Sequence, residues 1–235
     1  MELVILGCDG SYPGANGATS GYLLNCGNAG SVLLDCGCAV LPRLMALMDP
    51  AKLQAIVITH WHNDHACDLL TLRYYLQINK LKLKVYAPIE PNGLRQLCEG
   101  SEFELVDLAQ GFSFGDVRVS ALRVNHPLPA YAVKLVQGDK SFVYTGDTSQ
   151  CDALVSFCEG ADMLLCDATF AAAQWHEKMP HLSAALAGQL GREASVKRLL
   201  LTHCQPGSDS KTLLDEAKAV FPGSQWAMQG GRYHL

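Results

Sequence analysis

The strongest guide to the fold is a run of metal-binding side chains at residues 59–65, which read THWHNDH. An apolar run, Ala55–Ile58, directly precedes them and predicts a buried strand. Histidine and carboxylate side chains are common ligands of zinc and similar metals, and several of them in one tight loop can converge on a point. A solvated histidine-rich turn is the alternative, and further potential ligands later in the chain argue against it.

Three other predicted strands also end at a potential ligand. The run 117–124 leads to His126, the run 142–144 to Asp147, and the run 199–201 to His203. In layered α/β folds, functional side chains lie on loops at one edge of the sheets. A single histidine after a strand is usually a capping or core residue, but repeated strand ends of this kind favour one shared metal site.

The order of the predicted elements indicates two similar halves. We expect strands at 2–6, 20–26, 31–35, 55–59, 83–86, 117–124, 131–137, 141–145, 162–166, 197–202 and 225–228. We expect helices at 40–48, 67–79, 92–99, 153–159, 183–194 and 210–220. Strands followed by helices, twice over, imply two sheets packed face to face with helices outside.

Size and composition favour one domain over residues 1–235. The chain has 235 residues, of which 49% are hydrophobic and 17% charged, and no linker or low-complexity tract divides it. The first half alone could not cover both faces of its sheet. We therefore expect the two halves to pack together as a single unit.

Charge and hydropathy bear on the partners of the chain. The net charge is −5 and the basic residues are scattered, whereas proteins that hold long nucleic acids usually show a basic stripe. A small-molecule substrate is therefore the expectation. The apolar runs are too short to cross a bilayer, and the start, MELVILG, lacks the features of a signal peptide. We expect a cytoplasmic protein without a membrane partner.

The chain contains ten cysteines, which are dispersed rather than paired at close spacing. Several lie inside apolar runs, as at Cys26 and Cys166, so we expect reduced, buried thiols and no disulfide framework. Metal binding by Cys36 and Cys38 is the alternative, but no second cysteine or histidine pair with zinc-site spacing accompanies them.

The potential ligands resemble those of a known family. HWHNDH matches the HxHxDH signature of the metallo-β-lactamase superfamily, and His126, Asp147 and His203 match its remaining ligands in order. The segment LLDCG at residues 33–37 resembles the turn before the first helix of that family. The resemblance implies an αββα sandwich of two similar halves, in agreement with the order of elements above.

The resemblance also implies a site for two divalent metal ions. The first would be held by His60, His62 and His126, the second by Asp64, His65 and His203, and Asp147 would bridge them. Zinc is the expected metal, with manganese and iron as alternatives. A hydroxide between the ions would be the nucleophile, because metal coordination can lower the pKa of water from 15.7 to ~7. Asp64 would also orient that nucleophile.

Two later segments resemble the ribonuclease Z branch of the superfamily. CDATF at residues 166–170 and HLS at residues 181–183 are similar to its HEAT and HST motifs. There a glutamate and a histidine beside the metals protonate the leaving group, and here Asp167 and His181 stand in their places. Cys166 replaces the histidine of the first motif, and Leu182 interrupts the second. The alternative is structural, with Asp167 capping a turn and His181 starting a helix.

The resemblance to the ribonuclease Z branch narrows the range of substrates that we expect. Members that process tRNA carry a Gly/Pro-rich arm after the third metal histidine, whereas the residues between His126 and Asp147 read here as one hairpin. The opening residues 7–24 and the HPLP segment at 126–129 look like armless bacterial metallo-hydrolases of this branch. We therefore expect a phosphodiesterase for a small or cyclic phosphodiester, in a homodimer, rather than a tRNA 3′-processing enzyme.

Other functions use the same fold. Thioester or lactone hydrolysis would use the same metal core without Asp167 and His181. Flavodiiron relatives place a glutamate where His62 stands and need a flavin domain, which we do not expect within these 235 residues. A non-catalytic role would fit a degenerate site, yet every expected ligand is present. His176 and His234 match no motif of the family, and we expect them at the surface or in C-terminal packing.

Overall fold

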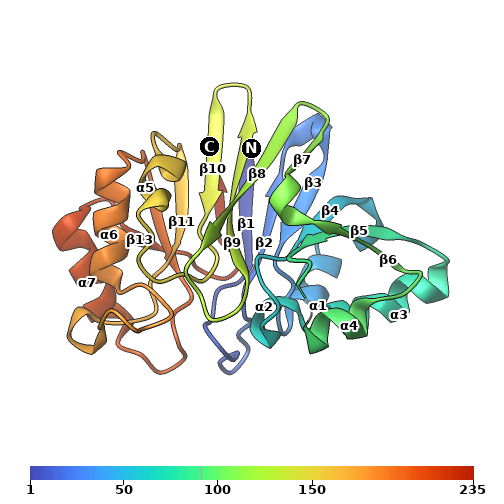
Figure 1. Ribbon diagram of the computed structural model, residues 1–235, viewed down its shortest axis with the longest axis horizontal. Helices are drawn as coiled ribbons and strands as arrows, with labels where there is room; N and C mark the ends of the chain where they lie inside the picture. Colours follow the sequence, from blue (N-terminus) through green and yellow to red (C-terminus); the bar gives the residue numbers. More distant parts are fainter. Residues whose placement is uncertain (91) are drawn as a thin grey trace.

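The computed structural model describes residues 1–90 and 92–235, and it consists of two sheets between two layers of helices (Figure 1). The strands of the first sheet are β1 Glu2–Gly7, β2 Gly21–Asn25, β3 Ser31–Leu34, β4 Leu53–Val57, β5 Leu83–Ala87, β6 Phe103–Asp107 and β14 Arg232–His234. Those of the second are β7 Phe112–Phe114, β8 Val117–Val124, β9 Ala130–Gln137, β10 Lys140–Tyr144, β11 Met163–Asp167, β12 Leu199–Thr202 and β13 Gln225–Trp226.

The helices cover the outer face of each sheet, which confirms the expected αββα sandwich (Figure 1). On the first sheet lie α1 Val40–Met45, α2 Asn63–Ala66, α3 Leu69–Asn79 and α4 Gly93–Cys98. On the second lie α5 Ala153–Cys158, α6 Ala184–Glu193 and α7 Ser210–Val220. The strand orders are β14-β1-β2-β3-β4-β5-β6 and β13-β12-β11-β10-β9-β8-β7.

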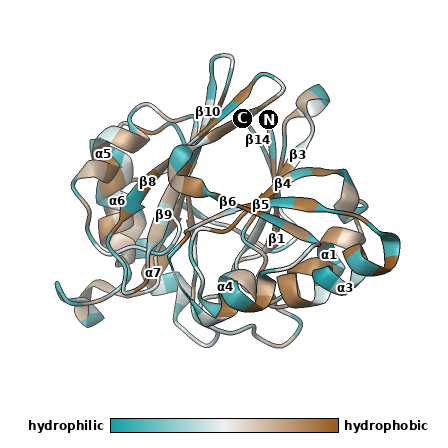
Figure 2. Ribbon diagram, turned by 45° about the vertical axis from the view of Figure 1, so that its right-hand side comes forward, coloured by the Kyte–Doolittle hydropathy of each residue, from teal (hydrophilic) through white to brown (hydrophobic). Residues whose placement is uncertain are grey.

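Three apolar clusters fill the spaces between the layers. In β1, Leu3 and Ile5 face the opposite sheet, whereas Val4 and Leu6 face the helices of their own half. A strand that is covered on both faces must be apolar at every position, which explains why these runs lack polar alternation. The helices α3 and α4 carry both hydrophobic and hydrophilic residues, because only one face of each helix is covered (Figure 2).

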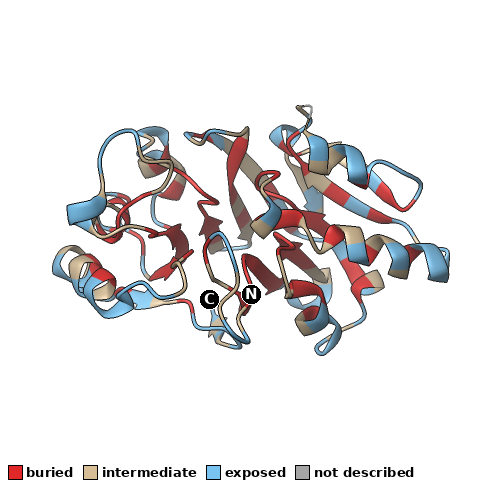
Figure 3. Ribbon diagram, turned by 90° about the horizontal axis from the view of Figure 1, so that it is seen from below, coloured by how far each residue is buried: buried red, intermediate tan, exposed pale blue. Residues whose placement is uncertain are grey.

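The topology brings many loops to one edge of the sandwich. The strands β3 to β6 are parallel, as are β10 to β13, so their carboxyl ends share a direction within each sheet. The loops that follow β1, β4, β8, β10, β11 and β12 gather at the lower edge in Figure 1. Figure 3 looks onto this edge, where buried strand ends lie behind exposed loops.

Three short strands were not predicted: β6, β7 and β14. Each lies at an end of its sheet. The strand β14 pairs antiparallel with β1, with Glu2 opposite His234, so the end of the chain completes the sheet of the first half. The expected helix at 40–48 ends earlier, at Met45, and the expected strand at 225–228 ends at Trp226.

The cysteines of the described residues are free thiols, of which Cys26, Cys36, Cys98, Cys158 and Cys166 are buried and the others half-buried. Burial raises the pKa of several of them, among them Cys158, whose pKa rises to about 12. Within the described residues, no helix has the length and apolar character needed to cross a membrane.

Candidate metal centre

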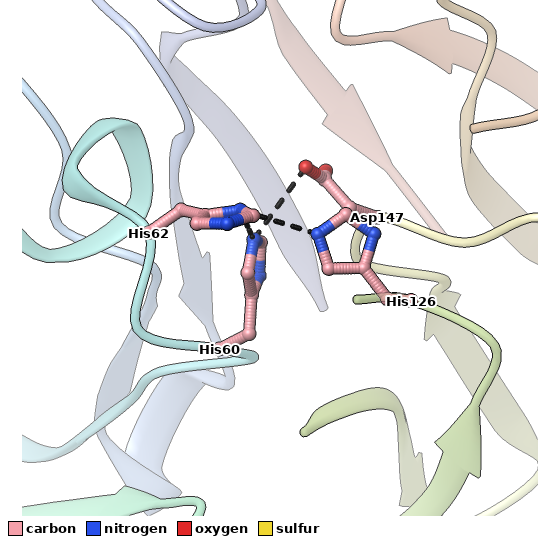
Figure 4. Close-up of side chains that lie close together, drawn as sticks. All are labelled: His60, His62, His126 and Asp147. Carbon is pink, nitrogen blue, oxygen red and sulfur yellow. Dashed lines mark hydrogen bonds and ion pairs between the residues drawn. The ribbon is translucent and has the colours of Figure 1, made fainter. Parts of the chain in front are cut away.

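The first group of potential ligands consists of His60, His62, His126 and Asp147, whose ligand atoms lie within 4.8 Å of one another. His62 Nδ1 is 2.9 Å from His60 Nε2 and 3.2 Å from His126 Nε2. Asp147 Oδ2 is 3.6 Å from His60 Nε2. The side chains come from the loops after β4, β8 and β10 and point toward a common centre (Figure 4).

The second group consists of Asp64, His65, Asp147 and His203. Asp147 Oδ2 is 3.2 Å from His65 Nε2 and 3.4 Å from His203 Nε2. Asp64 Oδ2 is 3.2 Å from the same nitrogen of His203. Asp147 therefore belongs to both groups, in the position of a bridge.

The donor set fits two divalent cations. His65 Nε2 and Asp147 Oδ1 are buried without a hydrogen-bond partner among the described residues. An unpaired buried polar atom costs about 1–3 kcal/mol, so a folded chain needs a partner for such atoms. Imidazole nitrogens and carboxylate oxygens at this spacing are ligands for zinc and related metals.

In four of these histidines the second ring nitrogen is held by the protein. The partners are Thr59 Oγ1 for His60 at 3.2 Å, Asp35 Oδ2 for His65 at 2.8 Å, Pro180 O for His126 at 3.2 Å and Thr169 Oγ1 for His203 at 2.9 Å. Such bonds fix the tautomer and leave the lone pair of the other nitrogen facing the centre.

Asp35 is the most connected of these partners, and the sequence singled out only the turn that contains it. Its carboxylate is completely buried. It accepts hydrogen bonds from the Thr59 amide at 2.7 Å, the Thr59 hydroxyl and the Tyr144 hydroxyl at 2.9 Å, besides His65. The carboxylate thus joins the end of β4 to β10 and orients His65.

The pKa values of the side chains in the centre are shifted in different directions. Burial lowers the pKa of His65, but Asp147 and Asp35 outweigh it and hold that pKa well above its usual value. Burial raises the pKa of Asp147, but His203 and His65 outweigh it and hold that pKa well below its usual value. In His60, burial dominates and lowers the pKa. The neighbouring carboxylates therefore favour the protonated form of His65, and the neighbouring imidazoles favour the ionised form of Asp147.

The structure brings Asp167 and His181 together beside the second group. His181 Nδ1 is 2.9 Å from Asp167 Oδ2, and the ring of His181 stacks on that of His203 with centroids 4.9 Å apart. Burial lowers the pKa of His181, but Asp167 outweighs it and raises the pKa to about 9. His181 does not start a helix, because Ser183 caps α6 by accepting from the Leu186 amide.

Asp167 is itself completely buried and fully engaged. Its Oδ1 accepts from the Thr169 hydroxyl at 2.7 Å and from the Thr169 amide at 3.2 Å, and its Oδ2 accepts from the Thr148 amide at 3.2 Å. The turn-capping role that we considered for Asp167 therefore exists together with its contact to His181. Thr169 also links Asp167 to His203.

One further contact was missed from the sequence. The Ser11 amide, in the loop after β1, donates to Asp64 Oδ2 at 2.8 Å. Ser11 has a positive φ of 63°, which is uncommon for a residue other than glycine. His176 and His234 are exposed and belong to neither group of potential ligands. Cys36 and Cys38 also belong to neither group, so the cysteine site considered above does not form among the described residues.

Comparison with known proteins agrees with this geometry. A family model described as "Beta-lactamase superfamily domain" matches residues 30–204. The chain is 33% identical over 232 residues to "Probable metallo-hydrolase YhfI" of Bacillus subtilis, with 95% of each protein covered. The crystal structure of YhfI, described as a metallo-beta-lactamase fold protein, matches with a TM-score of 0.92 at 31% identity, covering 99% of this chain and 98% of that one.

A more distant relative belongs to the expected branch. "Ribonuclease Z" of Geobacillus kaustophilus is 26% identical over 308 residues, with 100% of this chain and 99% of the relative covered. Together these relatives and the histidine and aspartate cluster support a metal-dependent hydrolase. The chain belongs to the metallo-β-lactamase superfamily, in its ribonuclease Z-like branch.

Proposed function

We propose that this chain is a dinuclear metal-dependent phosphodiesterase that acts on a small or cyclic phosphodiester. The observation that carries the proposal is the pair of the buried Asp167 and the half-buried His181, with 2.9 Å between carboxylate and imidazole, beside a two-metal donor set. Hydrolysis of a phosphodiester requires a proton for a poorly departing alkoxide, and a positioned acid typically contributes 10²–10⁴-fold.

The two metals would be held by the side chains that the structure gathers. His60, His62 and His126 would hold one, Asp64, His65 and His203 the other, and Asp147 both. Dications in these positions would supply Lewis-acid activation of the phosphate and make water a nucleophile at neutral pH. Zinc is the metal that we expect for this mixture of nitrogen and oxygen ligands.

The residues of the chain would then divide the remaining work. Asp167 holds His181 Nδ1, so the Nε2 of the same ring is left to deliver a proton to the leaving oxygen. The raised pKa of His181 means that this proton is present at neutral pH. Asp64, which accepts a hydrogen bond from the Ser11 amide, would orient the attacking water.

A panel of substrates tests the proposal. Zinc-loaded protein should be assayed against bis-p-nitrophenyl phosphate, cyclic nucleotides, thioesters and lactones. We expect phosphodiesters to be hydrolysed with the highest kcat/KM, and His181→Ala to impair them. Preferred hydrolysis of thioesters or lactones, with full activity in His181→Ala, would instead establish the alternative that uses the metal core alone.

A further inference from the structure

The loop between β11 and α6 carries His181, and its two ends are tied together. The Phe170 amide donates to the Leu182 carbonyl at 3.3 Å, and the Ala184 amide donates to the Phe170 carbonyl at 2.9 Å. On the first arm of the loop, residues 168–175, the Ala172 amide donates to Glu216 Oε2 of α7 at 2.8 Å. These contacts anchor the loop at its ends and on its first arm.

One side chain crosses this loop. The indole Nε1 of Trp175, on the first arm, donates to the carbonyl oxygen of His181, on the second arm, at 3.0 Å. The preceding carbonyl, that of Pro180, is 3.2 Å from His126 Nδ1. The His181 ring is itself held by Asp167. Three hydrogen bonds therefore hold His181 and the peptide bond before it, and of these three only the indole bond comes from a residue within the loop.

We infer that Trp175 is a positioning residue for His181, an inference that rests on the proposed function. The indole does not touch the reacting atoms. It fixes the backbone from which the imidazole projects, so the direction of Nε2 toward the leaving oxygen depends on it. Loss of a neutral hydrogen bond typically corresponds to about 3–10-fold in an equilibrium or rate.

Trp175→Phe isolates this bond, because it keeps an aromatic ring and removes only the N–H donor. The test compares two probes, thymidine 5′-p-nitrophenyl phosphate, with an aryl leaving group, and the dinucleotide TpT, with an alkoxide leaving group. We expect kcat on TpT to fall about 3–10-fold and kcat on the aryl ester to change less, because nitrophenolate departs without a proton.

Trp226→Phe is the matched control. Its indole also donates to a backbone carbonyl, that of Ser210, at 2.9 Å, but outside the loop of His181. It should leave the ratio of the two rates unchanged. The Nδ1–H resonance of His181, measured by ¹H–¹⁵N spectroscopy of the zinc-loaded protein, should broaden in Trp175→Phe and persist in Trp226→Phe.

A double-mutant cycle with His181→Ala tests whether the two residues act together. If Trp175 acts through His181, Trp175→Phe in the His181→Ala background should cause almost no further loss on TpT. Additive losses, or equal losses on both probes in Trp175→Phe, would overturn the inference while leaving the proposed function intact. Equal losses on both probes in His181→Ala alone, with both metals retained, would instead contradict the proposed function.

Discussion

Individual side chains in the centre are held by partners that are not themselves potential ligands. Asp35 holds His65, Thr169 holds His203, and the Pro180 carbonyl holds His126. Partners of this kind tune metal affinity because they orient each ring and raise its basicity. We therefore expect the metal affinity of the site to depend on residues outside the HxHxDH signature.

Asp35→Asn tests this dependence. The amide keeps the shape of the side chain, but it removes the negative charge that faces His65 Nδ1 at 2.8 Å. We expect metal affinity to fall about 10–100-fold, measured by competition with a chromogenic chelator. Tyr144→Phe removes only one of the hydrogen bonds to Asp35 and should have a smaller effect. An affinity equal to wild type in Asp35→Asn would contradict this role.

The second residue-scale prediction concerns acid catalysis by His181. His181→Ala should lose roughly 10²–10⁴-fold on an alkyl phosphodiester and much less on an activated aryl one, because only the alkoxide needs a proton. Asp167→Asn should show the same pattern more weakly, by misorienting the imidazole. Metal content must be measured in each variant, since lost metal would imitate lost acid catalysis. Equal losses on both substrates would leave His181 with a structural role.

The sequence predicted the potential ligands better than their partners. A ligand position is visible because a histidine or aspartate follows an apolar run at a strand end. The contact between Pro180 and His126 joins segments that are far apart in the chain, and a backbone carbonyl carries no residue signature. Asp35 had a signal, the turn LLDCG, but its hydrogen bonds arise only in the folded sandwich.

At the scale of elements, the turn after β3 packs closely against α2, which carries Asp64 and His65. The Cys36 amide donates to the His65 carbonyl at 2.7 Å, and a Cβ at Gly37 would overlap the Asp64 carbonyl oxygen and the Thr19 hydroxyl. The backbone of α2, which carries these two potential ligands, is therefore set by close packing against a glycine.

Gly37→Ala should consequently disturb the centre without changing any potential ligand. Overpacking against backbone atoms typically costs about 1–3 kcal/mol, and α2 would have to shift to relieve it. We expect a lower Tm and weaker metal binding, measured by calorimetry and chelator competition. Gly93→Ala is the control, because a Cβ there meets nothing within 4 Å at the start of α4. Unchanged metal binding in Gly37→Ala would contradict the argument.

The strands that sequence patterns missed share one property. The strands β6, β7 and β14 are edge strands, paired on one side only. An edge strand is incompletely covered, so it needs few apolar residues and shows little periodicity. The strand β14 is held by its pairing with β1 and by the Arg232–Glu2 ion pair at 3.2 Å. Neither contact produces a hydrophobic pattern in the sequence. The central strands, covered on both faces, were all predicted from their apolar runs.

At the scale of the whole molecule, the centre joins the two halves. Asp64 and His65 come from the loop after β4 in the first sheet, whereas Asp147 and His203 follow β10 and β12 in the second. Metal bound between them would link the sheets and stabilise the folded chain over the unfolded one.

Metal removal should therefore destabilise the protein. We expect two ions per chain, roughly 3.5–4 Å apart, by elemental analysis and X-ray absorption. At metal concentrations 100 times above Kd, each site stabilises by about 2.7 kcal/mol, so chelation should lower the Tm by about 5–10 °C per ion. At most one ion per chain under varied metal supply would contradict the two-metal site.

Metal affinity should also depend on pH. Asp147 and Asp35 raise the pKa of His65 and so favour its protonated form, and a proton on Nε2 must leave before that atom can bind a cation. Affinity should therefore fall as the pH is lowered, by about tenfold per pH unit for each proton displaced. Asp35→Asn should weaken this dependence, because the pKa of His65 would no longer be raised by that carboxylate.

The small substrate that we propose leads to a prediction at the scale of the whole molecule. Between His126 and Asp147 the chain forms only the antiparallel pair β9 and β10, whereas the alignment with ribonuclease Z extends over 308 residues against the 235 of this chain. With a net charge of −5, long RNA would gain little from phosphate neutralisation. We expect kcat/KM on 3′-extended precursor tRNA to be far below that on bis-p-nitrophenyl phosphate at physiological salt. Efficient, accurate 3′ cleavage of the precursor would show that a surface other than an inserted arm binds tRNA.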